Sequence, residues 1–140
     1  MVNQIEVTVE VIIHATEDRK KILDSIFELF EIKEEEFTEE RLVGHFENPI
    51  LLLKTKLTKK RAQEFIHKII SKISKVQIKE FFDNIDMHFE GSSLFLRIGK
   101  QDIIRKTINI QQNDAMKIKI SMPVYKKGDL VKTYMEVLKS

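Results

Sequence analysis

The start of the chain decides the fold, because residues 5–13 read IEVTVEVII. Apolar and polar residues alternate there, and this period of two predicts a half-buried β-strand. Thr16 follows as a candidate helix N-cap, and Glu17 and Asp18 suit the positively charged start of a helix. Apolar residues then recur at helical spacing and predict a helix over residues 17–31, at Ile22, Leu23, Ile26, Phe27 and Phe30.

The rest of the chain repeats both kinds of pattern. Strands are predicted over residues 41–46, 50–57, 94–98, 107–110 and 115–122. Helices are predicted after the candidate cap Thr58, over residues 78–89 and over residues 129–138, with a break near Ser74. The acidic residues 31–40 are expected to form a solvated connection. The order βαββα(α)βββα predicts an α+β fold, a two-layer sandwich of one mostly antiparallel mixed sheet and one helical layer. One face of the sheet is expected to be partly open to solvent.

Length and composition restrict the class of protein. The 140 residues suit a single domain, 1–140, and 42% hydrophobic with 33% charged residues is typical of a globular chain. The longest apolar run, residues 50–53, is far shorter than the roughly 18 residues of a membrane helix. No cysteine is present, which excludes disulfides and thiolate metal sites. We expect a cytoplasmic protein without a membrane partner.

The charges are segregated along the chain. Residues 1–48 carry five basic and thirteen acidic side chains, whereas residues 49–140 carry nineteen basic and nine acidic ones. Residues 54–79 alone hold nine basic side chains against the single carboxylate of Glu64. Such asymmetry indicates a polyanionic partner, and a set of solvated, lysine-rich helix faces is the alternative.

Signatures of catalysis are missing from the sequence. It contains no Gly-rich phosphate loop, no Gly-x-Ser-x-Gly elbow and no His-Glu-x-x-His helix. The histidines fall in separate predicted elements without metal-ligand spacing, at His14, His45, His67 and His88. Asp83 and Asp86 could share a helix face, but a solvated acidic patch explains them at least as well. We therefore expect a protein that is not an enzyme and that has no metal and no cofactor.

The helix that follows Thr58 opens with three cations, Lys59, Lys60 and Arg61. Cations are disfavoured at a helix N-terminus, so an anion outside the chain, such as RNA phosphate, is expected to compensate them. Further basic residues continue along one side of this helix, beginning with Lys68. A solubilising face opposite the isoleucines is the competing interpretation.

The predicted strands supply a second positive surface. If the leucines of residues 50–57 and the isoleucines of residues 115–122 point inward, the lysines between them point outward, at Lys54, Lys56, Lys117 and Lys119. The same alternation leaves Phe95 and Arg97 outward. Aromatic and arginine side chains on an open sheet can stack RNA bases while lysines hold phosphates. A loop or a partner subunit could instead cover Phe95.

Three stretches match a known family. Residues 43–50 read VGHFENPI and resemble the Gly-His-Phe-x-Asn-Pro hairpin of the archaeal exosome-subunit-like RNA-binding proteins. Residues 14–18, HATED, resemble that family's first strand-to-helix junction, and residues 94–101, LFLRIGKQ, resemble its Leu-x-Leu-Arg-x-x-Lys-Gln segment. Gly99 departs from that segment, where an acidic or polar residue is more usual. The resemblance implies a fold similar to the large-subunit ribosomal protein that binds 5S RNA, and a link to RNA processing.

The hairpin motif also has a physical reading. Gly44 lets another backbone approach closely, Asn48 and Pro49 set a rigid turn, and His45 is expected beside the amide of Asn48. These four residues could build the turn alone, or His45 and Asn48 could also contact RNA.

The leading hypothesis is a non-catalytic RNA-binding protein linked to RNA processing or degradation, with an exosome as a possible partner. It assigns phosphate contacts to the helix start, the sheet lysines, Arg97 and Lys100. The alternative is a charge-segregated adaptor, or a homodimer or larger homo-oligomer, whose acidic and basic parts bind complementary protein surfaces without RNA.

Overall fold

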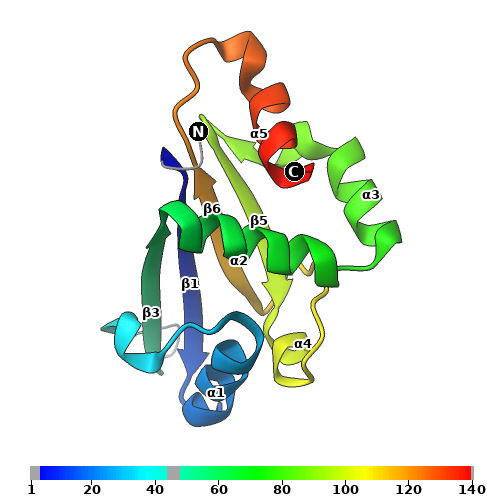
Figure 1. Ribbon diagram of the computed structural model, residues 1–140. Helices are drawn as coiled ribbons and strands as arrows, with labels where there is room; N and C mark the ends of the chain where they lie inside the picture. The colour runs from blue at the N-terminus through cyan, green and yellow to red at the C-terminus, as the bar shows by residue number, and fades with distance from the viewer. Residues whose placement is uncertain (1–3, 44–47, 140) are drawn as a thin grey trace.

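The computed structural model describes residues 4–43 and 48–139. Its centre is one six-stranded sheet with the order β2-β3-β1-β6-β5-β4, in which all neighbouring strands run antiparallel (Figure 1). The strands are β1 (Glu6–His14), β2 (Thr38–Val43), β3 (Pro49–Thr58), β4 (Phe89–Glu90), β5 (Ser93–Gly99) and β6 (Ala115–Ser121). The sheet is thus antiparallel throughout, where a mostly antiparallel mixed sheet was predicted.

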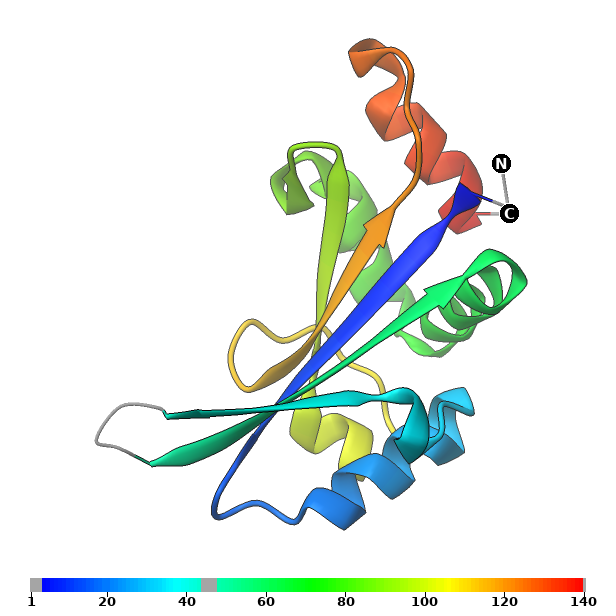
Figure 2. The same cartoon turned by 90° about the vertical axis from the view of Figure 1, so that its left-hand side faces the viewer.

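Five α-helices accompany the sheet, and they are α1 (Arg19–Phe30), α2 (Lys59–Lys72), α3 (Lys75–Asp83), α4 (Lys100–Ile104) and α5 (Leu130–Lys139). Short 3₁₀ turns join them, at η2 (Glu34–Glu36), η4 (Ile85–His88) and η5 (Lys127–Asp129). In Figure 2, α1, α2 and α5 lie to the right of the strands, while the β2–β3 hairpin projects to the left. The predicted α+β two-layer sandwich is confirmed. Within the described ranges, no helix is long and apolar enough to span a membrane.

The core lies between the sheet and this helical layer. Val7, Val9 and Val11 of β1 are completely buried, whereas Glu6, Thr8 and Glu10 between them are partly exposed. The predicted period of two therefore places one face of the central strand against the helices. Those helices contribute apolar side chains that are also buried, among them Ile22, Ile26, Phe65, Ile66 and Ile69.

Two helix starts differ in detail from the sequence prediction. The N-cap of α1 is Asp18 and not Thr16, because the Asp18 side chain accepts a hydrogen bond from the backbone N–H of Lys21 at 3.2 Å. Thr58 precedes α2 as predicted, but its side chain makes no capping hydrogen bond. The predicted break at Ser74 is confirmed, since its hydroxyl caps α3 through the backbone N–H of Gln77.

The segment between β5 and β6 was predicted wrongly. Residues 107–110 form a loop that contributes a single bridge, between Ile98 and Ile110, and α4 precedes it. The loop turns at Lys106, whose φ of 64° is left-handed and incompatible with an extended strand. Strand β2 begins at residue 38, inside the stretch that was expected to be a connection. Gly44 and His45 of the predicted hairpin turn lie outside the described residues.

Candidate nucleic-acid interface

The face of the sheet opposite the helices, here called the open face, carries cations in two neighbouring rows. Glu10 of β1 lies opposite Lys54 on one side and Lys117 on the other, and Lys117 in turn lies opposite Arg97. In the next row Thr8 lies between Lys56 and Lys119, and Lys119 lies opposite Phe95. The side chains that were predicted to point outward therefore lie on one face of the sheet, and they are the sheet lysines, Phe95 and Arg97.

Only part of this positive charge is neutralised within the chain. Lys54 lies 3.6 Å from Glu10 and Lys56 lies 3.3 Å from Glu6, so the β3 lysines each have a carboxylate partner on β1. Arg97, Lys117 and Lys119, here called the cationic cluster, form no ion pair with any described residue. The Lys117 ammonium instead lies 4.8 Å from the centre of the Phe95 ring, a cation–π contact. The uncompensated charge of the open face is thus concentrated on β5 and β6.

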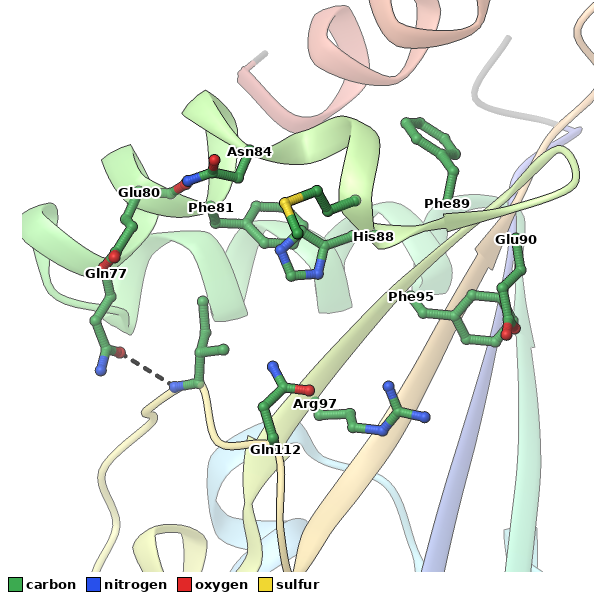
Figure 3. Close-up of a pocket in the computed structure, with 12 residues that line it drawn as sticks. Gln77, Glu80, Phe81, Asn84, His88, Phe89, Glu90, Phe95, Arg97 and Gln112 are labelled. Carbon is green, nitrogen blue, oxygen red and sulfur yellow. Dashed lines mark hydrogen bonds between the residues drawn. The ribbon is translucent and has the colours of Figure 1, made fainter.

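A groove of about 630 Å³ adjoins the cationic cluster. It lies between the segment 77–90, which includes α3 and η4, and the outward residues Phe95 and Arg97 of β5, and Ile110 and Gln112 of the following loop close it. We call it the α3–β5 groove. In Figure 3, His88 lies above the groove and Gln112 and Arg97 lie below it.

The position of His88 is fixed by its neighbours. Its imidazole lies against Phe81, with the two ring centres 4.6 Å apart. Burial lowers the pKa of His88, and the nearby positive charge of Arg97 lowers it further. At neutral pH the ring is therefore uncharged and offers one hydrogen-bond donor and one acceptor. Nearby, the loop is tied to α3, because the backbone N–H of Ile110 donates to the Gln77 side chain at 3.1 Å.

The start of α2 is largely compensated from within the chain. Arg61 forms a bidentate pair with Glu36 of η2, with one Nη2–Oε2 distance of 3.1 Å. Lys60 lies 4.0 Å from Glu64, and Lys68 lies 3.3 Å from Glu31. The acidic stretch that was expected to be only a solvated connection thus supplies a partner to the α2 cations. Lys59 and Lys60 remain exposed.

Lys100 is not available to a phosphate, contrary to its predicted role. Its side chain is only 3% exposed, and its ammonium lies 2.8 Å from Glu17, 3.0 Å from Asp114 and 2.6 Å from the carbonyl oxygen of Ile12. Alternation along the strand could not reveal this, because β5 ends at Gly99 and Lys100 begins α4.

The carboxylates around Lys100 form, with His14, a cluster of potential metal ligands. Each of these residues offers one ligand atom, and the three atoms, from His14, Glu17 and Asp114, lie within 4.8 Å of one another. Burial raises the pKa of Asp114, but the hydrogen bond and the positive charge of Lys100 outweigh burial and leave that pKa below its usual value. The ammonium of Lys100 already supplies the positive charge that a metal ion would bring to these carboxylates.

The stretches that carry the family resemblance meet in this region. Lys100 joins Glu17 of the 14–18 stretch. Pro49 of the hairpin stretch lines a pocket of about 300 Å³ together with His14, Arg19 and Arg41. Asn48 and Pro49 are both exposed. The contacts of Lys100, the 14–18 stretch and Pro49 are consistent with an architectural role, whereas the 94–101 stretch also supplies Phe95 and Arg97 to the open face.

Sequence reasoning missed most of the groove. Gln77 and His88 come from the segment 77–90 and Gln112 from the loop before β6, and only the folded chain brings them to the outward side of β5. The one available signal was the outward position of Phe95 and Arg97, which marks the wall of the groove but not its other side.

Comparison with known proteins identifies relatives over nearly the whole chain. A family model described as RNA binding matches residues 6–122. The RNA-binding protein PAB1135 of Pyrococcus abyssi is 27% identical, over 94% of this chain and 92% of its own. Two solved structures of DUF54 proteins share the fold. Protein AF2318 of Archaeglobus fulgidus has a TM-score of 0.82 and 24% identity, over 94% of this chain and 97% of its own. Mth689 of Methanothermobacter thermautotrophicus has a TM-score of 0.78 and 23% identity, over 96% and 98%.

Proposed function

We propose, from the premise that the chain belongs to the RNA-binding family, that its open sheet face binds RNA phosphates without catalysing a reaction on them. The observation that carries this proposal is the cationic cluster. Arg97, Lys117 and Lys119 lie on adjacent strands in register, and no described carboxylate pairs with them. Hydrogen bonds from such cations to phosphate oxygens are charge-assisted and stronger than neutral ones.

Other predicted contacts rank below this cluster. Lys59 and Lys60 are exposed at the start of α2, so they can add contacts when RNA extends past the sheet. Lys54, Lys56, Arg61 and Lys68 would first have to exchange a carboxylate partner for a phosphate, which reduces their net gain. Lys100 is left out because it is buried. Asn48 can add a contact from the exposed hairpin.

Binding by matched variants tests this proposal. Lys117→Gln with Lys119→Gln removes two charges from the cationic cluster, and Lys20→Gln with Lys132→Gln removes two exposed charges from the helical layer. We expect the first pair to weaken binding of a single-stranded RNA about tenfold or more at moderate salt, and the second pair to change it far less. Equal effects of the two pairs would show that total charge, and not the open face, controls binding.

The link to RNA processing, and to an exosome in particular, rests on the family resemblance alone. A pulldown from the native cytosol with and without RNase tests it. RNase-resistant recovery of exosome subunits supports a direct protein partner. Recovery that RNase abolishes points to shared RNA, and recovery of neither rejects the link.

A second candidate function is self-association through β2. This strand lies at the edge of the sheet, all six of its residues are exposed, and Val43 is 75% exposed. Exposed edge strands can pair with a second chain. Sedimentation of the free protein tests this candidate, with Val43→Lys as the variant expected to keep the protein monomeric.

A further inference from the structure

The α3–β5 groove is lined by both aromatic and polar uncharged side chains, and binding of phosphate alone does not require them. Its walls combine the aromatic rings of His88 and Phe95 with the amide of Gln112. A volume of about 630 Å³ falls within the roughly 300–1,000 Å³ of pockets that hold small molecules. Figure 3 shows the Gln112 amide and the His88 ring on opposite sides of the space.

Charge around the groove divides it into two regions. The exposed carboxylate of Glu80 lies on α3 and that of Glu90 lies on β4 at the edge of the sheet, and both repel a phosphate. Arg97 on β5 and, beyond it, Lys117 on β6 attract one. A ligand that suits both regions has an uncharged, planar part with a polar edge and an anionic part next to it.

A nucleotide in a single strand is such a ligand. We propose that the α3–β5 groove binds one unstacked nucleobase of a single-stranded RNA whose phosphates lie on the cationic cluster. The base contacts the rings of His88 and Phe95, and the amide of Gln112 hydrogen-bonds to its edge. Because His88 is uncharged at neutral pH, its ring offers the base an uncharged aromatic surface. This inference rests on the proposed function and adds to it the kind of RNA bound.

The aromatic side chains of the region are not all equivalent. Phe89 is engaged elsewhere, because its ring packs edge-on against the buried Tyr134 with the ring centres 5.1 Å apart. Phe81 is buried behind His88 and supports it. His88 and Phe95 are only partly buried, so they are the rings that an entering base can reach.

The test compares a uridine hexamer with a hexamer of the same ribose-phosphate chain without bases. Both carry the same phosphates, so only a base site separates them. We expect the unmodified protein to bind the uridine hexamer at least tenfold more tightly than the abasic one, and more tightly than a duplex with the same number of phosphates. Equal affinity for the two hexamers, each with a clear salt dependence, would overturn the groove inference and leave the proposed function standing. Absence of binding to every RNA would overturn both.

Matched variants locate the site. His88→Leu with Phe95→Leu removes both accessible rings and keeps all three charges of the cationic cluster, although Lys117 loses its contact with the Phe95 ring. Phe27→Leu with His67→Leu makes the same exchanges in α1 and α2, within the helical layer. We expect the base-dependent ratio of affinities to fall toward one in the first variant and to persist in the second. Loss of the ratio in both variants, or in neither, would overturn the assignment to this groove. If the first variant does not fold, Gln112→Ala, at an exposed loop residue, takes its place and is expected to lower the ratio severalfold, so an unchanged ratio overturns the assignment.

Discussion

The role of Lys100 in the structure differs from the role that the sequence predicted for it. In the sequence it follows the predicted strand 94–98 and was assigned a phosphate contact together with Arg97. In the structure its ammonium is enclosed by two carboxylates and a backbone carbonyl. The prediction failed because the partners of Lys100 come from distant parts of the chain, and no local pattern shows that the fold brings them to the start of α4. The outward positions of Phe95 and Arg97 were predictable because both lie inside the strand.

Lys100→Met tests this structural role. The variant keeps a long side chain but leaves the carboxylates of Glu17 and Asp114 without their cation, so we expect the free energy of unfolding to fall by about 3 kcal/mol. Urea denaturation measures it, and Lys72→Met, at an exposed lysine, is the control that should change little. If both variants are equally stable, Lys100 does not hold this region together.

Tyr134 offers a second test at this scale. It is completely buried, and its hydroxyl lies 2.6 Å from the carbonyl oxygen of Ser92, to which it donates. Tyr134→Phe should lower the free energy of unfolding by about 1–2 kcal/mol, because the carbonyl loses its partner. Burial also raises the pKa of Tyr134 to about 12. The unfolded chain therefore releases this proton first, and stability should decline as the pH rises from 10 toward 12. In Tyr134→Phe that part of the decline should be absent, and its persistence would contradict the assignment.

At the scale of elements, the start of α2 is where an electrostatic rule appeared to be broken. Three consecutive cations at a helix N-terminus suggested an external anion. The structure instead places η2 beside α2, and Glu36 binds Arg61. Local patterns made several elements predictable, namely the break at Ser74, β1, β3, β5, β6, α1, α2 and α5. The helix predicted over residues 78–89 was only partly right, because α3 ends at Asp83 and β4 begins at Phe89. The pairing of η2 with α2 was not predictable, since it joins residues 25 positions apart. Residues 107–110 were wrongly predicted to form a strand, because the path of this loop also depends on contacts with distant residues.

Neutralising each of the three cations should therefore change the free energy of unfolding in a different way. Lys59→Gln with Lys60→Gln removes repulsion from the helix dipole and should raise the free energy of unfolding by a few tenths to about 1 kcal/mol. Arg61→Gln should lower it by a similar amount, because the pair with Glu36 is partly solvated. Uniform stabilisation by all three substitutions would contradict the Glu36–Arg61 pair.

The effect of Arg61→Gln should also depend on pH. The hydrogen bond from Arg61 is the main cause that lowers the pKa of Glu36 below its usual 4.5. The stabilisation is therefore complete above pH 4.5 and is lost as the pH falls through the lowered pKa of the folded state. The stability difference between the parent and Arg61→Gln should be present at pH 6 and should shrink below pH 4.

At the scale of the whole molecule, the acidic and basic parts of the chain largely neutralise each other. Six ion pairs between described residues join them, linking Lys54 to Glu10, Lys56 to Glu6, Arg61 to Glu36, Lys68 to Glu31, Lys100 to Glu17 and Lys106 to Glu28. An adaptor that presents one acidic and one basic surface to separate partners fits this arrangement poorly. The sequence correctly indicated a positive excess, but only the sheet order shows where it lies. β6 lies beside β1, but Glu10 and Glu6 form their ion pairs with Lys54 and Lys56 of β3, so Lys117 and Lys119 have no carboxylate partner among the described residues.

The salt dependence of RNA binding tests the central claim most directly. Each phosphate of a single strand that a cation neutralises contributes about −0.7 to the slope of log K against log salt. The parent protein should therefore give a slope of about −2 or steeper. Arg97→Gln with Lys117→Gln and Lys119→Gln should flatten that slope by about two units. A flat plot for the parent, or an unchanged slope for the triple variant, would contradict the assignment of the RNA-binding surface to the open face of the sheet.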